Sequence, residues 1–285
     1  MKKGEVIDLV NRDLGDEHAA TLRYLIHGYL EGEDTPIGAS LLSRAREEMW
    51  HMHWLGMIVG QLGAEPNLVP AAYPYDPTNR VTIFKSYVEY EEKLIPHYNG
   101  EADRVDDPHI KRVLQREAWE SAIHARKFQR ILDKLSPEEA KGRPGGEAKL
   151  PKEFLDKLQK EIASKYTEML QHIRYSWVFQ KEGILGWQLM DQAMEKMKQL
   201  AHFAEDVAGD GIPPNFKQGQ VDTSVTIGLA LKKALEDVQN AREGHLGFHK
   251  DGEVKKHPGL VINLDLTVQQ EEYQAAEIKD WTKNK

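Results

Sequence analysis

The chain has 285 residues, of which 40% are hydrophobic and 29% are charged, and its formal net charge is −8. These values are typical of a globular protein, and the acidic balance argues against a nucleic-acid-binding surface or a basic face for anionic membranes. The absence of cysteine excludes disulfides, iron–sulfur clusters and zinc ribbons, so carboxylates and imidazoles remain as the strong metal ligands and methionine as a softer one.

Helical patterns cover most of the first half. Apolar residues recur every three or four positions in the stretches 10–28, 41–62, 84–98 and 113–131. Stripes of this length and period predict long amphipathic helices, and four of them predict a four-helix bundle. The segment 136–151, SPEEAKGRPGGEAKLP, interrupts the pattern with proline, glycine and charged residues. We therefore predict a linker there.

Helical patterning resumes at residue 152 in four further stretches, while the stretch 244–265 is predicted to be a long loop. Segments of the two halves match in the same order: EHAATLRY (17–24) parallels EMLQHIRY (168–175), and VTIFKSYVEYEE (81–92) parallels VTIGLALKKALE (225–236). The near-constant spacing of these matches favours a tandem duplication. We predict an all-α protein with one bundle over 1–135, a linker over 136–151 and a second bundle over 152–285.

Each apolar stripe of the first half contains a carboxylate near its middle, and two stripes also contain a histidine. Residues three or four apart lie on one helix face, so Glu48 and His51 can reach the same point inside the bundle. Glu120 can do so together with His124, and Glu117 is the alternative carboxylate on that helix. The predicted metal ligands are Glu17, Glu48, His51, Glu91, Glu120 and His124.

Charge explains why these residues would sit together. Four buried carboxylates without partners repel one another and take up protons, whereas two divalent cations would balance their charge. One Glu from each of two helices, with Glu and His from each of two others, is the di-metal carboxylate pattern of helix bundles. Oxygen donors with one nitrogen per metal suit iron or manganese, and zinc can also bind.

The same segments resemble the helices of bacterioferritins and other ferritin-like proteins, the rubrerythrin type included. EHAATLRYLIHG resembles the first helix, and EMWHMHWLGMIVGQLGAEPN resembles the second with its LG-x-x-P-N exit. EYEEKLIPHY and SAIHARKFQRIL resemble the third and fourth. The resemblance implies two ferritin-like bundles, two iron ions in the first, a homo-oligomer, and oxidation of Fe(II) or reduction of O2 or peroxide. An external electron donor would then serve the site.

The fourth helix departs from that family pattern. The family carries Glu three residues before its His, and this chain has Ser121 at that position. Glu120 precedes His124 by four residues and Glu117 precedes it by seven, which places Glu117 about 10 Å further along the helix axis. We therefore expect Glu120 to replace the missing ligand; a local helical bulge or the loss of one ligand are the alternatives.

The second half lacks both imidazoles of the pattern, because Gln199 and Gln274 stand at their positions. Lys196 replaces the second-helix Glu, and we expect it to pair with a carboxylate in a metal-free bundle. The candidate partners are Glu168, Glu236 and Glu271. The cluster His245, His249 and His257 favours a solvated loop over a surface metal site.

Haem is a further cofactor that the resemblance raises. Met49 follows Glu48, and Met197 holds the matching place in the second half; in bacterioferritins a Met at this position ligates haem across a two-fold interface. Packing is the simpler interpretation. Three other functions stay open: an iron-storage assembly, a di-iron oxygenase acting on an organic substrate, and a metal-free interaction module.

Cellular location follows from two absences. The first 20 residues have no apolar core of the signal-peptide kind, and no run of 18 apolar residues occurs. We expect a cytoplasmic protein with neither membrane nor nucleic acid as a partner.

Overall fold

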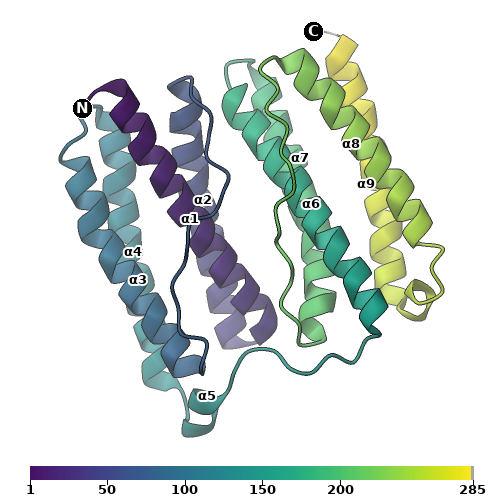
Figure 1. Cartoon of the computed structure of the whole chain (residues 1–285), viewed down its shortest axis with the longest axis horizontal. Coiled ribbons are helices and arrows are strands. Elements are labelled where there is room, and N and C mark those ends of the chain that lie inside the picture. The colour runs from purple at the N-terminus through teal and green to yellow at the C-terminus, as the bar shows by residue number, and fades with distance from the viewer. Residues whose placement is uncertain (284–285) are drawn as a thin grey trace. The chain divides into compact units, whose positions relative to one another are not determined.

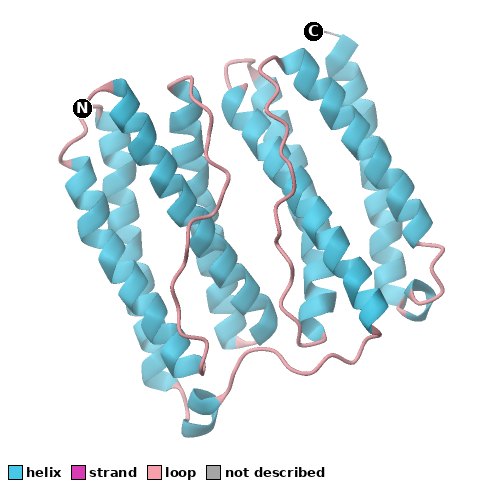
Figure 2. Cartoon of the chain, in the orientation of Figure 1, coloured by secondary structure: helices cyan, strands magenta, loops and turns pink. Residues whose placement is uncertain are grey.

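The computed structural model describes residues 1–283, and every regular element within them is a helix (Figures 1 and 2). The all-α prediction is therefore confirmed. The chain divides into two compact units, of which the first is Met1–Glu147 and the second begins at Ala148. None of the described helices is apolar enough, over a sufficient length, to cross a lipid bilayer.

The first unit is built from two antiparallel helical hairpins. Its helices are α1 (Lys3–Glu31), α2 (Pro36–Gln61), α3 (Arg80–Ala102), α4 (Pro108–Lys134) and the short α5 (Pro137–Lys141). The hairpins are α1 with α2 and α3 with α4, and α2 also packs against α4. The predicted linker is thus partly helical, and the main chain bonds back to the unit where Arg80 N donates to Gly142 O.

The turn between α1 and α2 shows why the first hairpin closes so tightly. The hydroxyl of Thr35 accepts a hydrogen bond from Gly38 N, and Pro36 occupies the first turn, where a missing N–H costs nothing. Gly32 has a φ of 86°, which favours glycine. A Cβ on Gly38 would lie 1.9 Å from the carbonyl oxygen of Gly32, so only glycine fits there.

A long connection without helix joins α2 to α3 and runs along α1 (Figure 1). It is held by Ala71 N donating to Gly15 O, at 2.9 Å, and by Asn67 N donating to Asn11 Oδ1, at 2.8 Å. It also brings the hydroxyl of Tyr73 to 2.9 Å from that of Tyr24. This connection therefore completes the aromatic core, in which Tyr24, Phe84, Tyr87 and Phe128 are fully buried.

The second unit repeats the order of elements. It contains α6 (Lys152–Val178), α7 (Ile184–Gly209), α8 (Ile227–Phe248), the 3-10 turn η1 (Val254–Lys256) and α9 (Pro258–Lys283). Helix α6 pairs with α7, and α8 pairs with α9. A second long connection without helix joins α7 to α8 (Figure 2). It is anchored by Tyr175, whose hydroxyl donates to Asp222.

The predicted loop over 244–265 is wrong at both ends. Helix α8 continues to Phe248, and α9 already begins at Pro258. Val254 lies in the short turn between them and is fully buried, so one apolar contact anchors a segment whose glycine and histidine content indicates a flexible loop. Proline at the first position of a helix is favourable, and this sets the start of α9.

Candidate metal site

Five of the six predicted ligands meet inside the first unit. The side chains form two overlapping groups, Glu17 with Glu48 and His51, and Glu48 with Glu91 and His124. Within each group the candidate ligand atoms lie within 4.8 Å of one another. All five residues are buried, so four helices place carboxylates and imidazoles where no bulk water solvates them.

Glu48 lies between the two histidines. Its Oε2 is 2.8 Å from Nδ1 of His51, and its Oε1 is 2.8 Å from Nδ1 of His124. Nδ1 of His51 also lies 3.0 Å from Glu17, and Nδ1 of His124 lies 3.5 Å from Glu91. One nitrogen carries at most one proton, so hydrogen bonding alone cannot satisfy two carboxylates at each ring. The side chains around Glu48 therefore form a candidate metal-binding cluster.

The outer nitrogens of both rings are held by two further carboxylates. Nε2 of His51 lies 2.7 Å from Glu120, and Nε2 of His124 lies 2.6 Å from Glu47. Such partners orient a metal-binding imidazole so that its other nitrogen faces the metal. Glu120 is thus placed differently from the other five predicted residues: it reaches across to a histidine on α2 from outside. Glu47 stood outside the predicted set.

The two hairpins of this unit are internally related. Glu47, Glu48 and His51 on α2 have the same spacing as Glu120, Ser121 and His124 on α4. On the other helices, Tyr24 of α1 donates to Glu91 at 2.5 Å, and Tyr98 of α3 donates to Glu17. Each tyrosine therefore orients the carboxylate of the opposite hairpin, and Ser121 occupies the position that corresponds to Glu48.

Glu117 supplies a carboxylate near this vacated position. It lies one helical turn before Ser121 on α4, is fully buried, and neither of its oxygens has a hydrogen-bond partner. Burial raises the pKa of Glu117 well above its ordinary value, the nearby imidazole of His51 opposes this, and the negative charge of Glu17 adds to it. An unpaired buried carboxylate is costly, and it points to a missing cation.

The pKa values of the other buried carboxylates also reflect negative charge that the surroundings do not fully compensate. Burial raises the pKa of Glu17 to about 8, against the opposing effect of His51, and it raises the pKa of Glu91 together with the charge of Glu48. Burial would also raise the pKa of Glu48, but the imidazoles of His124 and His51 lower it. The residues present therefore fit a pair of cations, which would replace the protons that the site otherwise holds.

The equivalent region of the second unit is an ion-pair network. Lys196 lies 3.1 Å from Glu168, as the sequence predicts. Lys165, which the sequence interpretation missed, is fully buried, lies 3.1 Å from Glu168 and bonds Glu271. The sequence did indicate its burial, because Lys165 continues the apolar stripe of Leu158 and Ile162.

One of the three candidate partners of Lys196 is not used, and one histidine is placed differently from the prediction. Glu236 is exposed and lies outside the network. His245 belongs to α8 rather than to a solvated loop, is buried, and places Nδ1 3.0 Å from Glu271. Among the residues described in the second unit, no three His, Asp or Glu side chains have metal-compatible spacing.

Haem ligation by Met49 and Met197 was the less favoured interpretation, and it stays untested. Met49 and Met197 lie in different units, and each is half-buried.

No family model, curated protein or solved structure matches the chain.

Proposed function

We propose that the first unit is a ferritin-like four-helix bundle that binds two metal ions, with iron preferred over manganese and zinc. The single observation that carries the proposal is the position of Glu48, whose two oxygens each lie 2.8 Å from the inner nitrogen of a different histidine. Glu17 would complete the position beside His51, and Glu91 would complete the position beside His124. Glu117 is a further buried carboxylate that interacts electrostatically with His51 and could serve the first position.

The proposed activity is oxidation of Fe(II), or reduction of O2 or peroxide with an external electron donor. Bound iron would supply the electrons. The protein supplies anionic oxygen ligands, which favour the ferric state. Tyr24 and Tyr98 hold Glu91 and Glu17 by hydrogen bonds from opposite hairpins, so these carboxylates are oriented before any metal arrives. Glu117 is positioned to hold a proton or to release it when a cation binds.

We propose that the second unit is a degenerate bundle of the same kind that carries no metal. The support is that lysine ammonium groups take the role that metal ions would have: Lys165 and Lys196 both lie 3.1 Å from Glu168 inside that unit. Cytoplasmic location and assembly into a homo-oligomer remain parts of this proposal. A metal pair in each unit would contradict it.

Metal content and oxygen uptake test the proposed function directly. The full chain would be loaded anaerobically with Fe(II), desalted, analysed for iron, and mixed with air in an oxygen electrode. We expect rapid oxygen uptake and two retained iron ions per chain that depend on His51 and His124. The variant His51→Gln/His124→Gln should lose these two ions and the oxygen uptake, whereas the exposed-histidine control His109→Gln should keep both. Iron near zero without oxygen uptake in the unmodified protein would favour the metal-free interaction module.

A further inference from the structure

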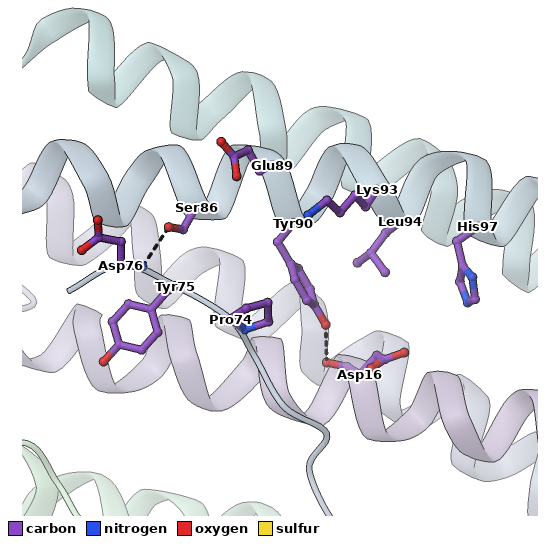
Figure 3. A pocket seen from close by; sticks show the side chains of 10 residues that line it. All are labelled: Asp16, Pro74, Tyr75, Asp76, Ser86, Glu89, Tyr90, Lys93, Leu94 and His97. Atoms are coloured by element: carbon purple, nitrogen blue, oxygen red, sulfur yellow. Dashed lines mark hydrogen bonds between the residues drawn. The ribbon is translucent and has the colours of Figure 1, made fainter. Parts of the chain in front are cut away.

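A pocket of about 500 Å³ opens on the first unit beside α3. Figure 3 shows Asp16 of α1 and His97 of α3 at one end of it, with Tyr90 between them and the connection at Pro74. The hydroxyl of Tyr90 donates to the main-chain oxygen of Asp16 at 3.4 Å. This contact joins α3 to α1 at the end of the pocket where Asp16 and His97 lie.

Three side chains at this end offer ligand atoms that converge. Asp13, Asp16 and His97 each place one candidate atom within 4.8 Å of the others. Nε2 of His97 lies 3.1 Å from Oδ1 of Asp13. Asp13 and Asp16 are three residues apart and therefore share a face of α1. Two carboxylates and one imidazole make a donor set that suits a divalent first-row metal.

Buried oxygens without hydrogen bonds give an independent sign of a missing cation. Asp13 is fully buried, and its Oδ2 has no hydrogen-bond partner. Glu101 is also buried, its Oε2 likewise lacks a partner, and its Oε1 lies 3.5 Å from Nε2 of His97. A buried acceptor that stays unpaired costs about 1–3 kcal/mol. A cation placed among these atoms would remove that cost.

Arg12 neutralises part of this negative charge from the solvent side of the cluster. Its guanidinium contacts Asp13 and Glu101, yet its side chain is 51% exposed. Arg104, also half-exposed, lies 3.6 Å from Glu101, so two guanidiniums and the imidazole of His97 surround the three carboxylates. None of these groups forms a hydrogen bond with Oδ2 of Asp13. Because the side chain of Arg12 is long and borders solvent, its head group can leave without disturbing the helices.

We propose that Asp13, Asp16 and His97 form a second, mononuclear site for a divalent cation, with Glu101 beside it and Arg12 as its competitor. This site shares no ligand with the pair of positions around Glu48, although Asp13 lies one turn before Glu17 on α1. The pocket gives the cation a route from solvent and leaves coordination positions open to water.

Binding of Mn(II) alone tests the site on the full chain. Metal-free protein would be dialysed to equilibrium against Mn(II), with bound ions counted per chain by metal analysis and free ions by electron paramagnetic resonance. Asp16→Asn/His97→Gln should bind one ion fewer than the unmodified protein. The matched control Asp8→Asn/His109→Gln, which changes exposed residues of the same types, should bind the same number. Equal stoichiometry in the test variant and the control would overturn the proposal.

Two further variants separate this site from the proposed metal pair. Glu48→Gln/His51→Gln should lose other ions and keep the ion that depends on Asp16 and His97. If instead that variant binds as many ions as the unmodified protein, the metal pair is refuted while the mononuclear site stands. Arg12→Gln should lower the dissociation constant for Mn(II) at the mononuclear site several-fold, because it removes the competing charge. Weaker or unchanged binding in Arg12→Gln would contradict the role of Arg12 and, with it, the proposed site.

Discussion

Nε2 of His51 lies 2.7 Å from Oε2 of Glu120, on the opposite side of the ring from the carboxylates that approach Nδ1. The contact crosses from α4 to α2, and Arg116 holds the other oxygen of Glu120 at 2.8 Å. Glu120 is therefore placed to orient an imidazole rather than to reach the interior. This distinction between orienting and ligating can be measured.

Replacing Glu120 by glutamine should weaken metal binding without abolishing it. Removal of a carboxylate that orients a metal-binding histidine costs about 10–100-fold in affinity. Competition with a coloured chelator would measure this on Glu120→Gln, and Glu47→Gln should behave alike because it holds His124. Asp133→Asn, an exposed change on α4, is the control. Complete loss of one metal in Glu120→Gln would show instead that Glu120 is itself a ligand.

Features of the fold and the candidate site could be predicted from the sequence where the residues involved lie on one helix, and less well where their partners lie on another. Helix positions followed from apolar periodicity, because each helix buries one stripe. Glu48 and His51 followed from their spacing of three on that stripe. The direction of Glu120 did not follow, because its partner lies on another helix and only the packing of α2 against α4 brings the two together. Lys165 was missed although Glu168 follows it by three residues on α6, because its other carboxylate partner, Glu271, lies on α9 and meets it only through the packing of the helices.

Stability of the metal-free protein should fall as the pH rises from about 5 to 8. Burial raises the pKa of Glu17 to about 8 from 4.5, and the neighbouring carboxylates raise the pKa values of His51 and His124 although burial opposes this. The folded state thus binds more protons than the unfolded chain in this window, so the free energy of unfolding decreases with rising pH.

Calorimetry would check this pH dependence. We expect the melting temperature of metal-free protein to drop by more than about 5 °C across the window, since 1 kcal/mol shifts it by about 2–8 °C in domains of this size. Mn(II) should abolish the drop, because metal binding favours the deprotonated ligands. Glu17→Gln should flatten the metal-free curve. Comparing the two curves cancels contributions common to both proteins, such as that of His172, whose pKa burial lowers to about 3. A melting temperature that rises with pH in the metal-free protein would contradict the assignment.

The ion-pair network of the second unit should respond asymmetrically to substitution. Lys165 and Glu271 are fully buried, so Lys165→Met leaves carboxylates without a partner and should cost about 3–5 kcal/mol. Lys165→Met/Glu271→Leu should recover part of that loss, because both charges are then gone. Denaturant unfolding would measure these values. Lys157→Met, on the same helix but half-exposed, should change stability by less than about 1 kcal/mol; an equal loss there would mean that the burial of Lys165 is irrelevant.

Glu117 and Ser121 allow the missing ligand to be tested from both sides. Glu117 is buried with both oxygens unpaired, so Glu117→Gln should stabilise the metal-free protein by about 1–3 kcal/mol at pH 7, because a buried charge or its neutralisation is no longer required. The same variant should weaken binding of one metal, because it removes an anionic donor. Opposite signs for stability and metal affinity are the expected result, measured by unfolding and by chelator competition.

Restoring a carboxylate at Ser121 completes this test. Ser121 corresponds to Glu48 in the internal repeat, so Glu117→Gln/Ser121→Glu should regain the metal affinity that Glu117→Gln loses and give up its gain in metal-free stability. Glu117→Gln/Ser121→Asn introduces a polar side chain at residue 121 without the negative charge. It should restore neither the metal affinity nor the original metal-free stability. If Glu117→Gln leaves metal affinity unchanged, Glu117 is no ligand. If it weakens binding and only Ser121→Glu repairs the loss, then the two positions of α4, one turn apart, serve the same cation.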